Sequence, residues 1–323
     1  MLELTNLSNA SCDVENLLQN RTDTLDAVIR AHCLDGVELM LCAPLDETMY
    51  PLKYIKSVHL IYWPTWLDFW RGNKTALLEE FGSEENIRAY YGSLAVGDWV
   101  ESWKQNLRQA VRCLPHYVVF HVAHNLTSEM YTRRFSASDA DVIQGTIELV
   151  NELVPEIPPG CKFLFENLWW PGLTFQKPHL AEMLLEKVAY PDTGFMLDVG
   201  HLMNTNCALR SEDDGAVYVQ QIYRSLGAIG TRIYGLHLHQ SLSGDYTKQM
   251  MRRHAGMRRP LDWAEAMAYV MHVDQHRPFR TDAARRILDT IQPMYLVHEF
   301  LSHTRTAWEE NLRTQRHALG RTQ

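Results

Sequence analysis

Eight short apolar runs, each followed by a longer segment of helical periodicity, constrain the fold of this sequence most strongly. The runs are rich in Val, Leu, Ile and Phe, a composition typical of parallel strands that are buried on both faces. They cover residues 2–6, 36–41, 57–63, 117–121, 162–167, 194–199, 233–239 and 294–300. Strands that alternate with helices form parallel sheets, and eight of them predict an α/β fold with a closed (β/α)8 TIM barrel.

Amphipathic segments between the runs are the expected outer helices of such a barrel. The clearest are residues 23–33, 136–153, 217–226 and 282–291. In the first of them, Leu25, Val28 and Ile29 recur at helical spacing, which places them on one face. The charged C-terminal segment, residues 305–323, is expected to form an exposed helix with a frayed end.

The alternation of runs and helices continues without a linker-like change in composition, so one domain is predicted over residues 1–323. This length is ordinary for a single barrel. Two connections are longer than usual, residues 64–115 after the third run and residues 240–293 after the seventh. Both begin at the carboxyl end of a strand, where barrel active sites lie, so these long loops are expected to shape or cover the pocket.

Composition narrows the partners and the compartment. The formal net charge is -8 with the 15 His counted as neutral, which disfavours bulk nucleic acid as a partner. The six Cys form no C-x-x-C pair, so free thiols in a reducing compartment are expected. The first residues show no targeting pattern and no apolar run is long enough to span a bilayer, so we expect a cytoplasmic protein without a membrane partner.

Ionisable side chains gather at the carboxyl ends of the apolar runs. They are His59, His121, Glu166, Asp198, His201, His237, His239, His298 and Glu299. A carboxylate in a buried strand is costly without a partner, because removing a charge from water costs several kcal/mol. Three carboxylates that converge on one barrel mouth need a common counter-charge, and a divalent cation supplies it.

Each of these residues has an ordinary explanation when it is taken alone. A histidine at a strand end is more often a core or loop residue than a ligand, and Asp198 could simply cap the helix that follows it. The recurrence of the feature in strand after strand favours a metal site instead. The remaining histidines, His116, His179, His272 and His276, are expected to be surface or packing residues.

The motifs at these positions occur in the order found in a known superfamily. They are GVEL around Glu38, VHL around His59, FH at His121, FEN at Glu166, LDVGH at Asp198 to His201, LHLH at His237 and HEF at Glu299. Over nearly its whole length the chain resembles the xylose-isomerase-like TIM barrel superfamily. That superfamily includes sugar isomerases, sugar epimerases and the endonuclease IV group.

The resemblance implies a ligand set and a reaction. It implies that Glu166, Asp198, His237 and Glu299 bind one divalent ion (Mn, Co, Mg or Zn) and that His201 contacts the substrate or a second metal. In epimerase-type members two glutamates act as acid and base. Glu166, Glu299 and His201 would then be catalytic in a metal-dependent isomerase or epimerase of a small keto-sugar or polyol, whose oxygens the metal polarises.

A second hypothesis comes from the endonuclease IV branch, whose members bind two or three zinc ions. Additional residues that could hold a second metal or contact substrate are His59, His121, His201, His239 and His254. The branch carries an acidic residue two positions before the histidine that would match His254, whereas this chain has Arg252. The alternative function is a metal-dependent hydrolase of a phosphoester or glycosidic link in a nucleotide-type or cobamide-type ligand. A binding module without catalysis is the third hypothesis, which the complete four-residue ligand set disfavours.

Aromatic residues close to the strand ends suggest the walls of a pocket. Trp63 and Trp66 follow the third run, Trp169 and Trp170 follow the fifth, and Arg253 belongs to a basic group that could hold a phosphate. Packing between barrel and helices is the ordinary alternative for such rings. We expect a small-molecule substrate. The number of aromatic rings would also suit a large planar ligand, such as a nucleotide or a corrinoid. A homodimer is also possible for this class.

Overall fold

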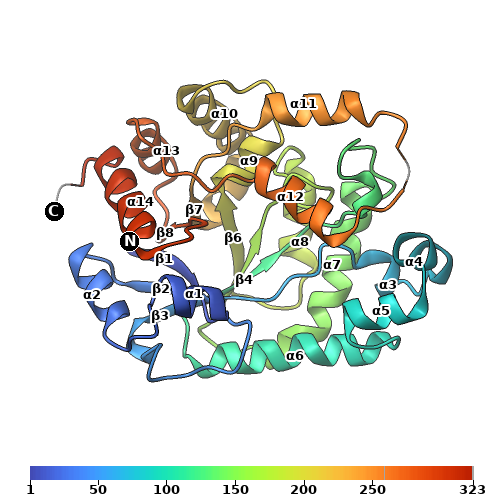
Figure 1. The fold of residues 1–323 in the computed structure, drawn as a ribbon, viewed down its shortest axis with the longest axis horizontal. Coiled ribbons are helices and arrows are strands. Elements are labelled where there is room, and N and C mark those ends of the chain that lie inside the picture. Colours follow the sequence, from blue (N-terminus) through green and yellow to red (C-terminus); the bar gives the residue numbers. More distant parts are fainter. Residues whose placement is uncertain (258, 322–323) are drawn as a thin grey trace.

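The eight apolar runs form eight parallel strands, which close in chain order into one barrel, with β8 paired to β1 (Figure 1). The computed structural model describes residues 1–257 and 259–321. The strands are β1 (Leu2–Ser8), β2 (Gly36–Met40), β3 (Ile55–His59), β4 (Tyr117–His121), β5 (Lys162–Glu166), β6 (Thr193–Asp198), β7 (Ile233–Leu238) and β8 (Tyr295–His298). The predicted (β/α)8 barrel is confirmed.

The expected helices form the outer layer of the barrel. Those that lie outside the two long connections are α1 (Ser11–Asn16), α2 (Thr24–Ala31), α7 (Asp139–Leu153), α8 (Pro178–Lys187), α9 (Val199–Asn204), α10 (Glu212–Ser225) and α14 (Arg305–Ala318). Helix α10 begins well before the predicted residue 217, because Ser211 and Asp214 form a capping box at its start. No helix of the described residues is long and apolar enough to cross a membrane.

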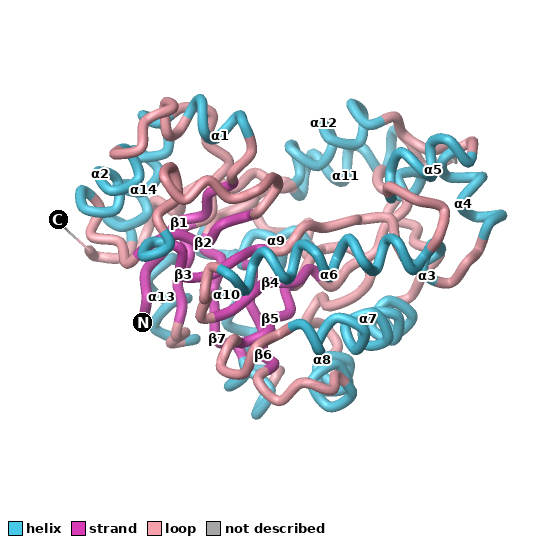
Figure 2. The backbone as a smooth tube through the Cα atoms, turned by 90° about the horizontal axis from the view of Figure 1, so that it is seen from below, coloured by secondary structure: helices cyan, strands magenta, loops and turns pink. Residues whose placement is uncertain are grey.

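Both long connections contain helices of their own. The connection after β3 holds α3 (Leu67–Trp70), α4 (Lys74–Phe81), α5 (Glu84–Tyr91) and α6 (Val96–Arg112), and the one after β7 holds α11 (Gly244–Arg253), α12 (Trp263–Val273) and α13 (Ala283–Ile291). Figure 2 shows α1 and α12 at the same end of the barrel, on either side of its opening. Helix α12, which belongs to the second of these connections, therefore lies at the carboxyl ends of the strands.

Apolar side chains fill the inside of the barrel below the ionisable residues. This interior cluster consists of Leu4, Tyr117, Val119, Leu164, Met196, Tyr295 and Val297. A much larger apolar layer lies between the strands and the surrounding helices. A further cluster, which includes Tyr131, Trp169, Trp170, Tyr269 and Val273, packs α12 against the loops that follow β4 and β5. The ionisable residues thus lie on an apolar floor, which excludes water from below.

The C-terminal helix is not the exposed element that its charge suggests. In α14, Trp308 and Leu312 are buried, and the indole of Trp308 donates a hydrogen bond to the hydroxyl of Thr5 in β1 (3.1 Å). The expectation of an exposed helix was therefore wrong, because α14 covers the seam where β8 meets β1. The expected frayed end includes residues 322 and 323, which lie outside the described residues.

Candidate metal centre

Ten ionisable side chains meet at the mouth of the barrel and form three groups, in each of which the possible ligand atoms lie within 4.8 Å of one another. The first group is His59, His121 and Glu166; the second is Glu166, Asp198, His237 and Glu299; the third is His201, His239, Asp274 and His276. Glu166 belongs to the first two groups. Strand ends of β3 to β8 supply most of these residues, because parallel strands present their carboxyl ends at one face of a barrel.

The second group contains the four residues that the family resemblance implies as ligands. Nδ1 of His237 lies 3.1 Å from Oε1 of Glu166, 3.1 Å from Oε2 of Glu299 and 3.8 Å from Oδ2 of Asp198. Glu166, Asp198 and His237 are fully buried. Glu299 lies just after β8, which ends at His298 rather than at residue 300 as predicted. The structure therefore brings together all four predicted residues.

A carboxylate behind His237 orients its ring. Nε2 of His237 lies 2.7 Å from Oε1 of Glu38, and the hydroxyl of Ser57 donates to Oε2 of the same carboxylate (3.2 Å). A carboxylate that accepts from the far nitrogen of a histidine aims the near nitrogen at a metal and raises its basicity. Glu38, from the predicted GVEL motif, is thus a supporting residue, and Nδ1 of His237 faces the cluster.

The first group places two imidazoles against one carboxylate oxygen. Nε2 of His59 and Nε2 of His121 each lie 3.0 Å from Oε2 of Glu166. Nδ1 of His59 donates to the carbonyl of Leu60 (2.8 Å), so in the neutral ring Nε2 carries a lone pair and no proton. A lone pair and a carboxylate repel each other unless a proton or a cation lies between them, so this geometry suits a cation.

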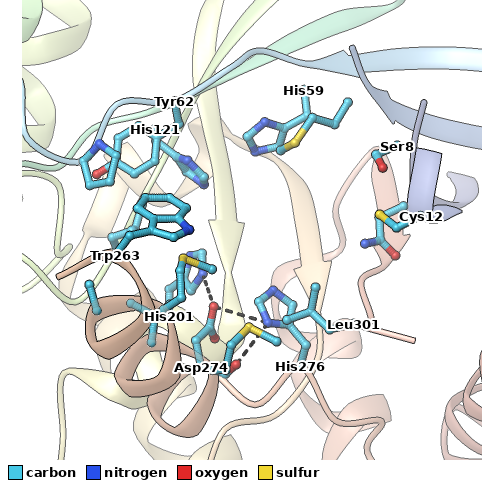
Figure 3. A pocket seen from close by; sticks show the side chains of 18 of the residues that line it. Ser8, Cys12, His59, Tyr62, His121, His201, Trp263, Asp274, His276 and Leu301 are labelled. Carbon is cyan, nitrogen blue, oxygen red and sulfur yellow. Dashed lines mark hydrogen bonds and ion pairs between the residues drawn. The ribbon is translucent and has the colours of Figure 1, made fainter. Parts of the chain in front are cut away.

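The third group overturns the expectation for His276. Nδ1 of His276 lies 3.2 Å from Oδ2 of Asp274, which is 3.0 Å from Nε2 of His201 (Figure 3). The ring of His276 stacks on that of His239 with centroids 4.1 Å apart. His276 was predicted to be a surface or packing residue, and Asp274 was not predicted at all.

A short backbone bridge explains why this pair reaches the barrel mouth. After α12 the chain runs back beside the end of β7, where Gln240 and Arg277 exchange backbone hydrogen bonds of 2.8 and 3.2 Å. The segment is irregular, with His276 in the left-handed region (φ 44°), and it brings Asp274 and His276 into the same group of ligand atoms.

Two other predicted residues lie away from the cluster. His254 ends α11 and stacks on Tyr131 at 4.4 Å, and among the described residues it belongs to none of the three groups. Arg253 is exposed on α11 and does not line the cavity. Arg258 of the same basic group lies outside the described residues. His254 and Arg253 were therefore misplaced, because α11 points away from the strand ends that it was expected to approach.

The tryptophans divide into two pairs. Trp169 and Trp170 line the cavity, as predicted. Trp63 and Trp66 do not line it: Trp63 packs against Trp103 (5.0 Å between centroids), and the indole of Trp66 donates to the carbonyl of Ala123 (2.7 Å). Because β3 ends at His59 rather than at residue 63, the chain turns before Trp63, and both rings join the helix layer.

The cavity above the cluster has a volume of about 1100 Å³. The three groups contribute His59, His121, His201, Asp274, His276 and Glu299 to its floor, while Tyr62, Trp169 and Trp170 form part of its wall. Three residues of α12, Trp263, Met267 and Met271, also line it and were not predicted. Their spacing of four residues on one helix face was the signal that could have identified them.

Electrostatic interactions in the cluster favour the charged forms of Glu166, His237 and His276. Burial alone would raise the pKa of Glu166, but His121 and His237 more than offset this and hold it well below the ordinary value. Burial would lower the pKa of His237, whereas Glu299 and Glu38 raise it well above the ordinary value. The pKa of His276 rises to about 9, because Asp274 and Glu299 outweigh the effect of its burial. In the absence of metal, protons on these histidines therefore balance the negative charge of the carboxylates, which bound cations would otherwise balance.

Buried atoms without partners support a metal-binding role. Nδ1 of His121 and Nδ1 of His239 make no hydrogen bond within the described part of the chain. Buried polar atoms normally have partners, so atoms that lack them at a ligand cluster fit coordination to an ion. A mixed set of imidazoles and carboxylates suits Zn, Mn or Co better than ions that prefer oxygen ligands alone. The residues present therefore fit divalent transition-metal ions.

Comparisons with known proteins identify the fold. No family model matches the sequence, and no curated protein matches it. The chain is similar to endonuclease IV from Thermus thermophilus (15% identity, 100% of both chains, TM-score 0.51). It is also similar to a D-tagatose 3-epimerase-like protein (15% identity, 99% of this chain and 97% of that one, TM-score 0.50). A third similar structure is the IOLI protein with a binding zinc atom (14% identity, 98% of this chain and 96% of that one, TM-score 0.50).

These similarities identify the fold rather than the reaction. The chain has the fold of the xylose-isomerase-like TIM barrels, as its ordered motifs predicted. Similarity at such low identity shows the fold alone. The chemistry must therefore be argued from the ten residues at the barrel mouth.

Proposed function

We propose that this protein is a metal-dependent hydrolase that cleaves a phosphoester with two or three divalent cations. The observation that carries the proposal is the third group, in which His201, Asp274 and His276 lie beside a complete four-residue group. Hydrolysis adds the oxygen of water to phosphorus, breaks the phosphorus–oxygen ester bond and gives a proton to the leaving oxygen. Divalent ions would supply Lewis acidity and would lower the pKa of water, and several such ions can stabilise both oxygens of the displacement.

The isomerase or epimerase expected first needs fewer of these residues. Its single ion and its acid–base pair would use Glu166, Asp198, His237 and Glu299, and His201 would contact the substrate. The other members of the first and third groups would be left without a role: His59, His121, His239, Asp274 and His276. Burying five further ionisable residues is costly unless they bind something. The hydrolase, which was the alternative in the sequence analysis, accounts for all ten residues, and it is preferred for that reason.

The protein residues would hold the ions and position the substrate. Glu38 would keep Nδ1 of His237 aimed at the second group, and the carbonyl of Leu60 would do the same for Nε2 of His59. The apolar floor of the barrel would exclude water from below the ions, which strengthens every electrostatic interaction above it. Glu166, which spans the first two groups, would fix the relative positions of two ions.

The size of the cavity supports a substrate larger than a sugar. Its volume of about 1100 Å³ exceeds the roughly 300–1,000 Å³ of ordinary small-molecule pockets. Tyr62, Trp169 and Trp170 offer ring faces that can contact a flat group. A phosphoester in a nucleotide-type or cobamide-type ligand fits this cavity better than a small keto-sugar.

Metal content and esterase activity together test the proposal. Elemental mass spectrometry should find two or three Zn, Mn or Co ions per chain, and the loaded protein should hydrolyse bis(p-nitrophenyl) phosphate. Asp274→Asn and His276→Gln should each remove one ion and most of the activity, while His179→Gln, an exposed change on α8, should change neither. One ion per chain, epimerisation of a ketohexose and no ester hydrolysis would establish the isomerase instead.

A further inference from the structure

One face of α12 exposes apolar side chains at the mouth of the cavity. Trp263, Met267 and Met271 follow one another at intervals of four residues and are 70%, 36% and 38% exposed. We call these three residues the α12 stripe. Among the described residues, ten large apolar side chains are exposed, and four of them line this one cavity: the α12 stripe and Leu301. Single exposed apolar residues are normally scattered over a protein surface, whereas several that lie together mark a binding surface.

The α12 stripe is not needed to hold the helix in place. A different face of α12 presents Tyr269 and Val273, which are buried in the cluster that contains Tyr131 and the two cavity tryptophans. This second face anchors the helix. The helix therefore has an apolar face for packing and an additional apolar face that opens to the cavity. Indole and thioether side chains combine a large contact area with adaptable shape, which suits them to ligand binding.

The α12 stripe is directly connected to the metal centre through the chain. Met271 lies three residues before Asp274, the residue at the C-terminal end of α12 that belongs to the third group. Figure 3 shows Trp263 on the opposite side of the cavity from Ser8 and Cys12, with His201 and Asp274 beside α12. A ligand whose phosphate lies at the third group would extend along α12 as it leaves the cavity.

We propose that the α12 stripe and Leu301 bind an apolar group of the substrate and select for it. The substrate class is a phosphodiester with a small or polar group on one side and a bulky apolar group on the other. This inference rests on the proposed hydrolase function. The occupant is substrate rather than protein, because one continuous cavity is lined by both the ligand groups and the α12 stripe. A protein partner would need an outward-facing patch instead.

Two phosphodiesters with the same p-nitrophenol leaving group test the proposal: one carries a methyl group and the other a naphthylpropyl group. The metal-loaded protein should prefer the naphthylpropyl ester, mainly through a lower KM. Trp263→Ala should reduce the ratio of kcat/KM between the two esters on the order of 10-fold, as expected for an aromatic contact residue. Val217→Ala, a change at an exposed apolar residue of α10 outside the cavity, should keep the ratio.

Equal kcat/KM values for the two esters, or an unchanged ratio in Trp263→Ala, would overturn the proposal. A binding assay separates this failure from failure of the hydrolase itself. If neither ester is cleaved, calorimetric titration with naphthylpropyl phosphonate still reports on the α12 stripe. Binding that weakens in Trp263→Ala but not in Val217→Ala supports the apolar subsite without hydrolysis, and no binding overturns it. A dimer that dissociates in Trp263→Ala, seen by sedimentation, would assign the α12 stripe to a second copy and overturn it too.

Discussion

At the scale of single residues, Glu166 connects the parts of the cluster. Its Oε2 lies 3.0 Å from both histidines of the first group, and its Oε1 lies 3.1 Å from Nδ1 of His237 and 3.4 Å from Nδ1 of His201. Each carboxylate oxygen therefore faces a different set of imidazoles. Under the proposed function, a change at this one residue would affect more than one ion.

Glu166→Gln is expected to lower the metal content by more than one ion per chain, because an amide is a much weaker ligand than a carboxylate. Glutamine has the same shape, so the circular dichroism spectrum should not change. Elemental mass spectrometry measures the content, and Glu186→Gln on the surface of α8 is the matched control. A Glu166→Gln protein with its full complement of ions would show that this residue does not bridge the groups.

Metal binding should release protons at pH 7. In the metal-free protein, carboxylate neighbours outweigh burial and raise the pKa of His276 to about 9, and they raise those of His201 and His237 well above their ordinary values. These rings therefore carry protons at pH 7, and a metal must displace them. The apparent affinity should rise with pH until about 9.

Calorimetric titration with zinc in buffers of different ionisation enthalpy measures the number of protons released. We expect more than one proton per chain at pH 7 and a smaller number above pH 9. Heats that do not depend on the buffer would contradict protonation of these rings. His276→Gln should reduce the release, since it removes one of the protonated groups.

At the scale of elements, strand ends were easier to predict than the segments that follow helices. A buried strand has a recognisable apolar run, and its polar last residue marks the barrel mouth, so Glu166, Asp198 and His237 were identified from the sequence. Asp274 and His276 follow α12 in an irregular segment that a backbone bridge holds beside β7. No local pattern predicts such a tertiary bridge, and His254 was considered in their place.

The directions of side chains near a strand end could also not be predicted from the sequence. The third apolar run extends to residue 63, so the strand was expected to end there. Trp63 and Trp66 were therefore expected at the strand end, in the pocket. The strand stops at His59, and both rings turn into the helix layer. Periodicity predicts that a strand exists far better than it predicts the residue at which the chain leaves the sheet.

Helix α14 should contribute strongly to stability because it covers the seam between β8 and β1. Trp308→Ala removes a side chain that is 1% exposed, together with its hydrogen bond to Thr5. Losing a buried tryptophan costs about 3–5 kcal/mol. Chemical denaturation of the metal-free protein measures this loss, and Leu114→Ala, a change at an 86% exposed residue, is the control. Equal stability of both variants would show that α14 is not required for closure.

At the scale of the whole molecule, bound ions should stabilise the barrel, because every strand from β3 to β7 and the end of β8 contributes to the three groups or leads into them. A ligand that binds only the folded state at 100 times its Kd adds about 2.7 kcal/mol. For a chain of this size, each kcal/mol raises Tm by about 2 °C.

Zinc or manganese is therefore expected to raise Tm by about 5 °C, and a chelator should reverse the change. Differential scanning calorimetry measures both effects. A variant that combines Asp274→Asn with His276→Gln should show a smaller increase, since one group is lost. A Tm that is indifferent to every divalent metal would leave the cluster without a role in ion binding.

The separation of α12 from the strand ends has an evolutionary consequence. The ligand groups depend on residues from many strands, so almost any change there damages the reaction. The cavity face of α12 depends on three side chains of one helix, which the packing of the barrel does not use. Under the proposed function, mutations on α12 would alter which molecule is accepted while the reaction stays intact, so related proteins would diversify their substrates within one short segment of the chain.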